Sequence, residues 1–331
     1  MKTSFTMEEK DFSRIGKSMM KRYNGNPIFK PEDFPFGTAD QVFNPGIAQM
    51  PDGRTILLLS VLFANQEYAK CYAAESTDGL HFTIHEKPLF SVDQDKKFGD
   101  LDFHPIDCRV TRFDEDGCFY IIRPANSAWG VCAILYKTTD FVNVEPIEIV
   151  ALPQNRVPCL FPEKINGKYY RLDRPYSPGA PYAKSSANIW VSASPDLIHW
   201  GEYRPLLLRN FAQWNGLKIG PTVPIKTEKG WLEIIHGVRN TFSGFQYSLG
   251  AMLLDLKDPS KILGVSMDYI LTPETEYEKS GVIPEVVFAT GAVVVPGTDE
   301  LRCYYGGADT TINLATGSVK ELVDLCLNKG M

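Results

Sequence analysis

The sequence predicts an all-β protein, a five-bladed β-propeller with short N- and C-terminal helical extensions. Three observations predict this fold. A hairpin signal recurs five times, a strand–turn–aromatic element follows several of the copies, and helical patterns are confined to the two ends of the chain. Small antiparallel sheets repeated around an axis protect most of their strand edges. The 331 residues are enough for one large domain of this kind.

The hairpin signal is a polar turn with glycine followed by a β-rich run. Asp-Gly and Asn-Gly between strand-like runs are the strongest short-range indicators of a hairpin. The copies are Asp52-Gly53 before 55–61, Asp116-Gly117 before 119–122, Asn166-Gly167 before 168–172, Lys229-Gly230 before 231–235 and, more weakly, Thr298-Asp299 before 301–305. Their spacing of about 50 to 70 residues gives several short strands per copy. An irregular β-sandwich with long insertions is the alternative fold.

A second element reads as a strand, a short polar turn and an aromatic residue that opens the next strand. It occupies 74–82, 136–141 and 191–200. Helical patterns occur at Glu8–Tyr23 and Ser318–Asn328. The sequence therefore divides into an N-terminal extension over residues 1–25, predicted to be helical, and a propeller over residues 26–331. A helical extension could pack on a neighbouring subunit, so a homo-oligomer is one expectation.

Composition limits the classes of partner. The net charge of −6 and the pI of about 5.5 argue against nucleic acid or an anionic membrane. The N-terminus shows no apolar signal region, and no apolar run is long enough to span a membrane. The seven cysteines are scattered without a Cys-x-x-Cys pair, which is typical of reduced thiols. His81 and His85 lie in a strand-like stretch, so no metal site is expected. These features predict a cytoplasmic location.

Polar residues recur at similar offsets from the hairpin glycines. Asn44, Asp107, Arg156 and Lys218 precede Gly53, Gly117, Gly167 and Gly230 by 9, 10, 11 and 12 residues. Arg174 and His236 follow their glycines by 7 and 6 residues, and Asp309 closes the last copy. In a propeller such residues converge on the axial funnel. Two arginines, a lysine and a histidine together suit a dianion such as phosphate. Taken singly, each of these side chains is more often a salt-bridging or core residue.

The sequence resembles glycoside hydrolase family 130, the β-mannoside phosphorylases. The resemblance runs from about Asn26 to Ala315. The segments that carry it are 43–46 (Phe-Asn-Pro-Gly), 107–111 (Asp-Cys-Arg-Val-Thr), 155–156 (Asn-Arg), 160–169 (Leu-Phe-Pro-Glu-Lys-Ile-Asn-Gly-Lys-Tyr), 173–175 (Asp-Arg-Pro), 217–220 (Leu-Lys-Ile-Gly), 230–232 with 236–238, 253–260 and 304–310.

The resemblance implies a role for each matching position. Asp107 matches the catalytic acid of the family. The phosphate-binding set is matched by Arg156, Arg174, Lys218, His236 and Tyr247, and the sugar subsite before the scissile bond by Asn44, Arg109 and Asp309. The implied reaction is inverting phosphorolysis of a β-mannoside, of manno-oligosaccharide, mannosyl-glucose or mannosyl-N-acetylglucosamine type, to α-mannose 1-phosphate. Inorganic phosphate would be the co-substrate, and no cofactor is implied. In the family the acid acts through a sugar hydroxyl.

Departures from the family pattern concern sugar contacts. The strand over 57–62 lacks an arginine that is common there, Glu285 stands where asparagine is usual after proline, and Cys108 follows the acid. The basic set is intact, which favours phosphorolysis over hydrolysis. Glu163 and Asp173 are interpreted as structural or orienting groups. A β-mannoside hydrolase of the same fold and a non-catalytic carbohydrate-binding propeller are the alternatives.

Overall fold

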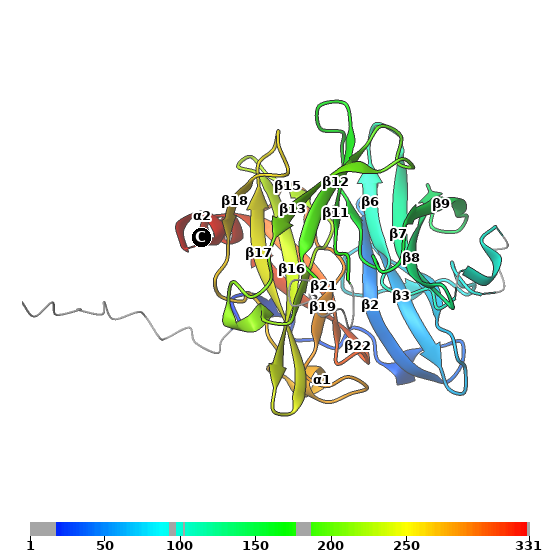
Figure 1. Cartoon of the computed structure of the whole chain (residues 1–331). Helices are drawn as coiled ribbons and strands as arrows, with labels where there is room; N and C mark the ends of the chain where they lie inside the picture. Colours follow the sequence, from blue (N-terminus) through cyan, green and yellow to red (C-terminus); the bar gives the residue numbers. More distant parts are fainter. Residues whose placement is uncertain (1–17, 93–96, 102, 177–186, 330–331) are drawn as a thin grey trace, which may run out of the picture.

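The fold is a five-bladed β-propeller. The computed structural model describes residues 18–92, 97–101, 103–176 and 187–329 (Figure 1). Their strands form five antiparallel sheets, one per predicted repeat. The first blade has β2 (Ala39–Gln49), β3 (Thr55–Phe63), β4 (Lys70–Ser76) and β5 (Thr83–Ile84). The second has β6 (Arg109–Phe113), β7 (Cys118–Ser127), β8 (Gly130–Thr138) and β9 (Glu145–Ala151). The third has β10 (Cys159–Leu160), β11 (Tyr169–Asp173), β12 (Ile189–Ser194) and β13 (Gly201–Leu207).

The last two blades each carry an additional short strand. The fourth has β14 (Lys218–Gly220), β16 (Trp231–Thr241), β17 (Gly244–Leu254) and β18 (Ile262–Val265), and β15 (Ile225–Lys226) also pairs with β16. The fifth has β19 (Val287–Ala289), β21 (Glu300–Gly307), β22 (Thr311–Ser318) and β1 (Lys21–Arg22), and β20 (Val293–Val294) also pairs with β21. The helical elements are η2 (Pro31–Asp33), η3 (Gly99–Leu101), η5 (Gln213–Asn215), α1 (Glu276–Lys279) and α2 (Val319–Lys329).

The two ends of the chain meet in the fifth blade. Strand β1 pairs with β22, with Lys21 opposite Thr316, so the first described strand completes the last sheet. Of the predicted helix over Glu8–Tyr23, the part up to residue 17 lies outside the described residues. The prediction is wrong for the last part, because residues 21–22 form a strand. The propeller thus begins before residue 26. The predicted C-terminal helix is confirmed as α2.

The core consists of five large apolar layers, one between each pair of neighbouring blades, and a small sixth cluster of Phe43, Ala69 and Ile106. The layer between the first two blades, for example, contains Ile56 and Leu58 with Phe119 and Ile121. Each sheet is covered on both faces, so its strands are apolar at successive positions. Strand β3 shows this in its run Thr-Ile-Leu-Leu-Leu-Ser-Val-Leu-Phe.

The second sequence element is an aspartate turn that repeats from blade to blade. In the first blade Asp78 Oδ1 accepts hydrogen bonds from the backbone N–H groups of Leu80 and His81, and Asp78 Oδ2 contacts His81 Nδ1 at 2.7 Å. Asp140 and Asp196 make the equivalent bonds in the second and third blades. An aspartate that bonds to the backbone two residues on favours a turn, so these residues fix the third-to-fourth strand connections. The His81 side chain is therefore part of this turn, through its contact with Asp78.

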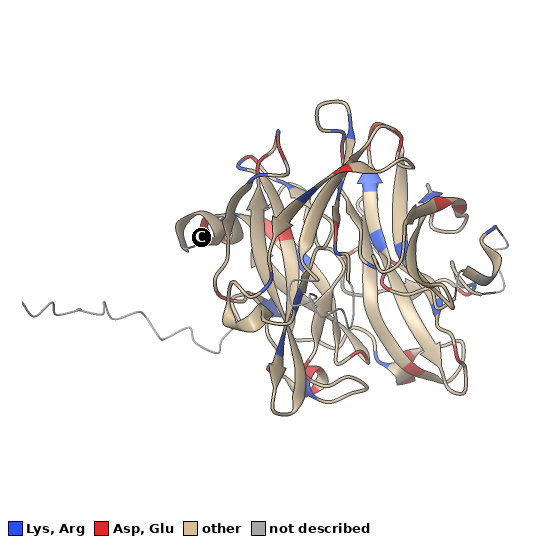
Figure 2. Ribbon diagram, in the orientation of Figure 1, with Lys and Arg blue, Asp and Glu red and all other residues tan. Residues whose placement is uncertain are grey.

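In the described part of the chain, no helix is long and apolar enough to cross a membrane. All seven cysteines are buried and none forms a disulfide, although Cys71 Sγ and Cys108 Sγ lie 3.8 Å apart, within hydrogen-bond distance. Basic and acidic residues are interspersed over the blades in the view of Figure 2.

Candidate functional site

The predicted site residues gather at the axial end where the first strand of each blade begins. Asn44 lies in β2, Lys218 is the first residue of β14, and His236 lies in β16. Asp107 and Arg156 lie in the segments that lead into β6 and β10, not on the strands themselves. The residues selected by their similar offsets therefore lie at the start of the first strand of their blade, or within it in the case of Asn44.

Asp107 is the centre of the polar cluster. Its side chain is buried, and Oδ1 accepts a hydrogen bond from Asn44 Nδ2 at 2.9 Å. The backbone N–H of Asp107 donates to Ser60 Oγ at 3.2 Å. Asn44 and Asp107 both have a left-handed backbone, with φ of 44° and 56°. Such conformations cost energy and cluster at functional sites, and here the two side chains are hydrogen-bonded to each other.

Four cationic side chains surround this carboxylate. Arg156 Nη2 lies 3.9 Å from Asp107 Oδ2. The Arg109 side chain is buried, and its Nη1 donates to the Asp107 carbonyl oxygen. Burial, and then the guanidinium groups of Arg156 and Arg109, lower the pKa of the buried Arg174 to about 10. Burial, and then Arg174 and Arg156, lower the pKa of Lys218 to about 7. The cations therefore lie close enough together to repel one another.

A lysine–tyrosine pair and a histidine complete the cationic side of the site. Lys218 Nζ donates to the Tyr247 hydroxyl at 2.6 Å. Burial, and then the Asp309 charge, raise the pKa of Tyr247 to about 12. His236 is buried, and burial followed by Arg174 and Lys218 lowers its pKa well below the usual range, so the imidazole is neutral. Its Nδ1 has no hydrogen-bond partner among the described residues. A neutral imidazole whose ring nitrogen has no protein partner can form a hydrogen bond with a ligand.

Arg174 is held in place by a network that begins in the same blade. Asn155 Oδ1 accepts from the backbone N–H of Arg174 at 3.1 Å, and Asn155 Nδ2 donates to Asp173 Oδ1 at 2.8 Å. Asp173 also pairs with the buried Arg171, whose Nε lies 2.9 Å away, and accepts from Ser192 Oγ at 2.6 Å. Asp173 thus anchors Asn155, which in turn holds the backbone of Arg174. Glu163 instead pairs with Lys226 at 2.7 Å near the surface, between the third and fourth blades.

Asp309 lies on the turn between β21 and β22, opposite the cations. Gln41 Nε2 donates to its carbonyl oxygen at 2.9 Å, and its backbone φ is 48°. Burial, and then the nearby Asp107 carboxylate, raise the pKa of Asp309 to about 7. The carboxyl groups of Asp107 and Asp309 thus share the site, near Asn44.

Sequence reasoning missed one aromatic side chain that joins the groups together. Phe288, on β19, has its ring centroid 4.9 Å from that of His236, 6.5 Å from that of Tyr247 and 5.5 Å below the Arg109 guanidinium. Its run Val-Val-Phe-Ala reads only as an apolar strand, so no local signal marks it. Ser60, which accepts the hydrogen bond from the Asp107 backbone, is a second site residue that the sequence did not mark, because it also lies within an apolar strand.

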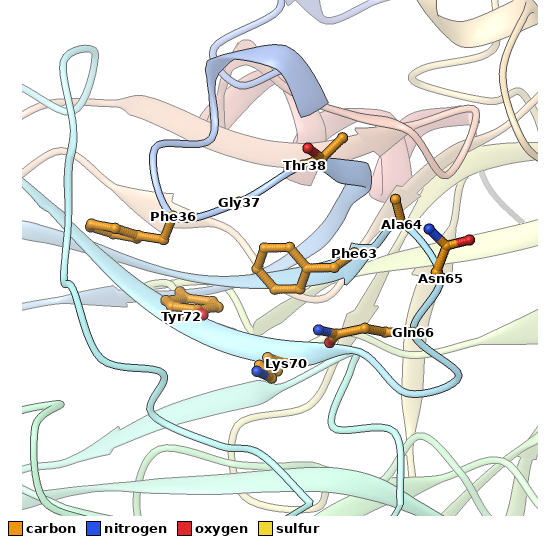
Figure 3. Close-up of a pocket in the computed structure, with 9 residues that line it drawn as sticks. All are labelled: Phe36, Gly37, Thr38, Phe63, Ala64, Asn65, Gln66, Lys70 and Tyr72. Carbon is orange, nitrogen blue, oxygen red and sulfur yellow. The ribbon is translucent and has the colours of Figure 1, made fainter.

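A separate pocket of about 330 Å³ lies in the first blade and contains none of the predicted site residues (Figure 3). Phe36, Phe63 and Tyr72 supply its aromatic side chains, and Gln66 and Lys70 supply polar groups. Among the described residues, no group of three or more His, Cys, Asp and Glu side chains could hold a metal ion.

The site combines a buried carboxylic acid with a cluster of mutually repelling cations. Buried cations without matching anions are costly unless a ligand supplies the negative charge. The fold and the site therefore define a propeller whose site could accommodate an anion beside a carboxyl group.

Comparison with known proteins gives the family. The sequence model of glycoside hydrolase family 130, described as β-1,4-mannooligosaccharide phosphorylase, matches residues 17–328. The chain belongs to this family. A β-1,2-mannobiose phosphorylase of Listeria innocua is 39% identical over 254 residues, which cover 76% of this chain and 66% of that protein. A β-1,4-mannooligosaccharide phosphorylase of Ruminococcus albus is 31% identical, covering 93% of this chain and 91% of that protein.

A solved structure agrees with both findings. The complex of the Listeria innocua β-1,2-mannobiose phosphorylase with β-1,2-mannobiose has a TM-score of 0.81 and 30% identity, and covers 93% of this chain and 99% of that one. The predicted family and fold are thus confirmed, and the chain is an enzyme of the mannoside phosphorylase family.

Proposed function

We propose that this protein is an inverting β-mannoside phosphorylase that releases α-mannose 1-phosphate. The observation that carries the proposal is the cation cluster of Arg156, Arg174 and Lys218 beside Asp107. An inverting reaction needs an acid on one face of the sugar and a nucleophile on the other. A hydrolase uses a second carboxylate to activate water, whereas this site offers cations where the nucleophile would be held.

The reaction follows from this arrangement. A phosphate oxygen attacks the anomeric carbon of the mannosyl unit and forms the new carbon–oxygen bond. The glycosidic carbon–oxygen bond breaks, and the leaving oxygen takes the proton supplied by Asp107. The cationic side chains, which the fold holds in place, position the phosphate dianion. They also stabilise the charge of the transition state, and they need not move during the reaction. The phosphate ester keeps an activated anomeric carbon, so the synthetic direction runs as well.

Asn44, Arg109 and Asp309 would bind the mannosyl unit. Asn44 contacts Asp107 directly, and Arg109 is anchored to the Asp107 backbone, so groups that hold the sugar also hold the acid. Asp309, with its pKa raised to about 7, can donate or accept a hydrogen bond to a sugar hydroxyl near neutral pH. The relatives act on β-1,2-mannobiose and on β-1,4-mannooligosaccharides, and both linkages are candidate substrates here.

The proposal is tested in the synthetic direction. The purified protein is incubated with α-mannose 1-phosphate and a panel of acceptors (mannose, glucose and N-acetylglucosamine), and released phosphate is measured. We expect phosphate release that depends on an acceptor and is lost in Asp107→Asn. Acceptor-independent release would show hydrolysis of the donor, and no release with any acceptor would contradict the proposal.

A further inference from the structure

The pocket in the first blade is separate from the site around Asp107. It is lined by the segment before β2, the end of β3 and the start of β4 (Figure 3). Phe63, in its wall, lies three residues beyond Ser60, about 10 Å along β3. Because successive side chains of a strand alternate, Phe63 and Ser60 lie on opposite faces of the sheet. Phe63 packs in the layer next to the fifth blade, whereas Ser60 bonds to Asp107.

Aromatic rings form much of this pocket. Phe34 is buried, and its ring centroid lies 5.0 Å from that of Tyr72, 5.5 Å from that of Phe63 and 5.8 Å from that of Phe36. The ring of Phe36 is nearly parallel to that of Tyr72, at 20°, with the centroids 6.2 Å apart. Phe36 remains 38% exposed. The cluster therefore presents an accessible aromatic surface at the pocket.

The fold holds the two sides of the pocket together. The backbone N–H of Ala64 donates to the carbonyl oxygen of Thr38 at 2.9 Å, so the loop after β3 is tied to the segment before β2. Gly37 has a φ of 136°, and a Cβ atom at this position would lie 3.1 Å from the Phe63 ring. Glycine thus lets the backbone pass close to this ring. The shape of the pocket is fixed by the backbone.

The hydroxyl group of Tyr72 lacks a protein partner. Tyr72 is only 4% exposed, and its side chain forms no hydrogen bond within the described part of the chain. Burial raises its pKa, with no contribution from a hydrogen bond or a charge. Buried tyrosine hydroxyl groups usually have a hydrogen-bond partner. Because Tyr72 lines the pocket, a ligand there can supply this partner.

The other polar groups of the pocket suit a neutral ligand that is rich in hydroxyl groups. Asn65 and Gln66 supply two amide groups, and Lys70 is the one charged side chain among the described lining residues. Lys70 Nζ lies 5.6 Å from the centroid of the Phe63 ring, so it would repel a cationic ligand from this aromatic surface. A single cation also offers much less to a dianion than the cluster around Asp107.

A pyranose ring matches both parts of the pocket. Its C–H groups form an apolar face that can pack on an aromatic ring, and its hydroxyl groups both donate and accept hydrogen bonds. Ligand sites commonly combine aromatic walls with a few polar groups that fix the orientation.

We propose that this pocket is a second carbohydrate-binding site, which packs one pyranose unit against Phe36 and hydrogen-bonds it to the Tyr72 hydroxyl. The choice of a mannosyl unit rests on the proposed function. The pocket would bind the sugar without cleaving it, since no acidic side chain is among its described lining residues. It would hold a manno-oligosaccharide near the site that cleaves it, and so raise its effective concentration there.

The test is NMR spectroscopy of the Asp107→Asn variant with carbon-13 in its alanine methyl groups. Ala64 lines the pocket, and Ala308 precedes Asp309 in the other site, so their methyl signals report the two sites separately. Each signal is identified by its loss in Ala64→Gly or Ala308→Gly. We expect β-1,4-mannobiose to shift both signals, each with its own saturation curve.

Two further variants, in the same background, each remove one feature of the pocket. Tyr72→Phe keeps the ring and should weaken binding at Ala64 about 2- to 12-fold, the effect of one neutral hydrogen bond. Phe36→Ala should abolish the saturable shift of Ala64. Neither variant should change the curve of Ala308. Phe242→Ala is the control, since Phe242 is also exposed but lies in the turn between β16 and β17, outside the pocket.

Several results would overturn the inference. One is the absence of a saturable Ala64 shift with mannobiose, and another is a shift that Tyr72→Phe and Phe36→Ala leave unchanged. A response to inorganic phosphate or α-mannose 1-phosphate but not to mannobiose would show an anion site instead. An equal response to cellobiose would overturn the choice of mannose. If Ala64 responds to mannobiose but Ala308 does not, and the wild-type protein shows no phosphorolysis, the proposed function fails while the pocket stands as a sugar site.

Discussion

Replacing Lys218 by methionine tests whether this lysine binds phosphate. Methionine has a similar length but carries no charge, and the variant would lose the 2.6 Å bond between Lys218 Nζ and the Tyr247 hydroxyl. A hydrogen bond to a charged group contributes about 1.5–3 kcal/mol. That range corresponds to roughly a 10- to 150-fold weaker affinity for phosphate.

The size of this loss should depend on pH. Burial, followed by Arg174 and Arg156, holds the pKa of Lys218 at about 7 in the phosphate-free protein. At pH 6.5 the wild-type lysine is mostly charged and binds phosphate fully. At pH 9 the wild-type lysine must take up a proton to do so, at a cost of about 1.4 kcal/mol per pH unit and so about 2.7 kcal/mol in total. The advantage over methionine should therefore nearly vanish at pH 9.

The assay measures initial rates of mannoside cleavage against phosphate concentration at both pH values. Lys226→Met is the control, since Lys226 lies in the same blade and pairs with Glu163 at 2.7 Å near the surface. We expect a raised KM for phosphate in Lys218→Met at pH 6.5, a much smaller effect at pH 9, and no effect in the control. An equal loss at both pH values, or no loss, would refute this account of Lys218.

Three further predictions concern the acid, proton uptake and the closure of the propeller. Asp107→Asn should abolish turnover while phosphate binding, measured by calorimetry, is retained; turnover near the wild-type rate would exclude Asp107 as the acid. Phosphate binding near pH 7.5 should take up a proton because an anion raises the pKa of Lys218 from about 7, and calorimetry in buffers of different ionisation enthalpy would detect it; equal heats in all buffers would argue against this. Arg22→Ala should lower the free energy of unfolding by about 3–5 kcal/mol in urea denaturation, because it leaves the buried Glu278 unpaired. The pKa of Glu278 is lowered although burial raises it, because the Arg22 bond and backbone N–H groups outweigh burial. Its stabilising effect should therefore be present above the usual glutamate range and be lost as the pH falls through the native pKa; a wild-type pH profile in Arg22→Ala would contradict this origin.

The five-fold repeat could be predicted from the sequence because each blade has its own short-range sequence pattern. The Asp-Gly and Asn-Gly hairpins and the aspartate turns at Asp78, Asp140 and Asp196 are short-range features, so the sequence alone predicts them. The apolar runs of strands such as β3 could not be assigned to one face, because they are covered on both.

The features that the sequence did not predict depend on contacts between residues far apart in the chain. Residues 21–22 form a strand because β22 is available to pair with them, almost 300 positions later, and nothing local favours that state. The role of Phe288 likewise comes from its neighbours in other blades, His236, Tyr247 and Arg109. Asp107 and Lys218, which the offsets from the hairpin glycines selected, lie at the start of the first strand of their blades, and their roles stay predictions.

The central claim is that phosphate, rather than water, cleaves the glycosidic bond. The direct measurement is cleavage of β-1,2-mannobiose and of β-1,4-mannobiose with and without inorganic phosphate, followed by phosphorus and proton NMR. We expect cleavage of at least one of them only with phosphate, with α-mannose 1-phosphate as the first product. Mannose released at the same rate without phosphate would contradict the account and show a hydrolase.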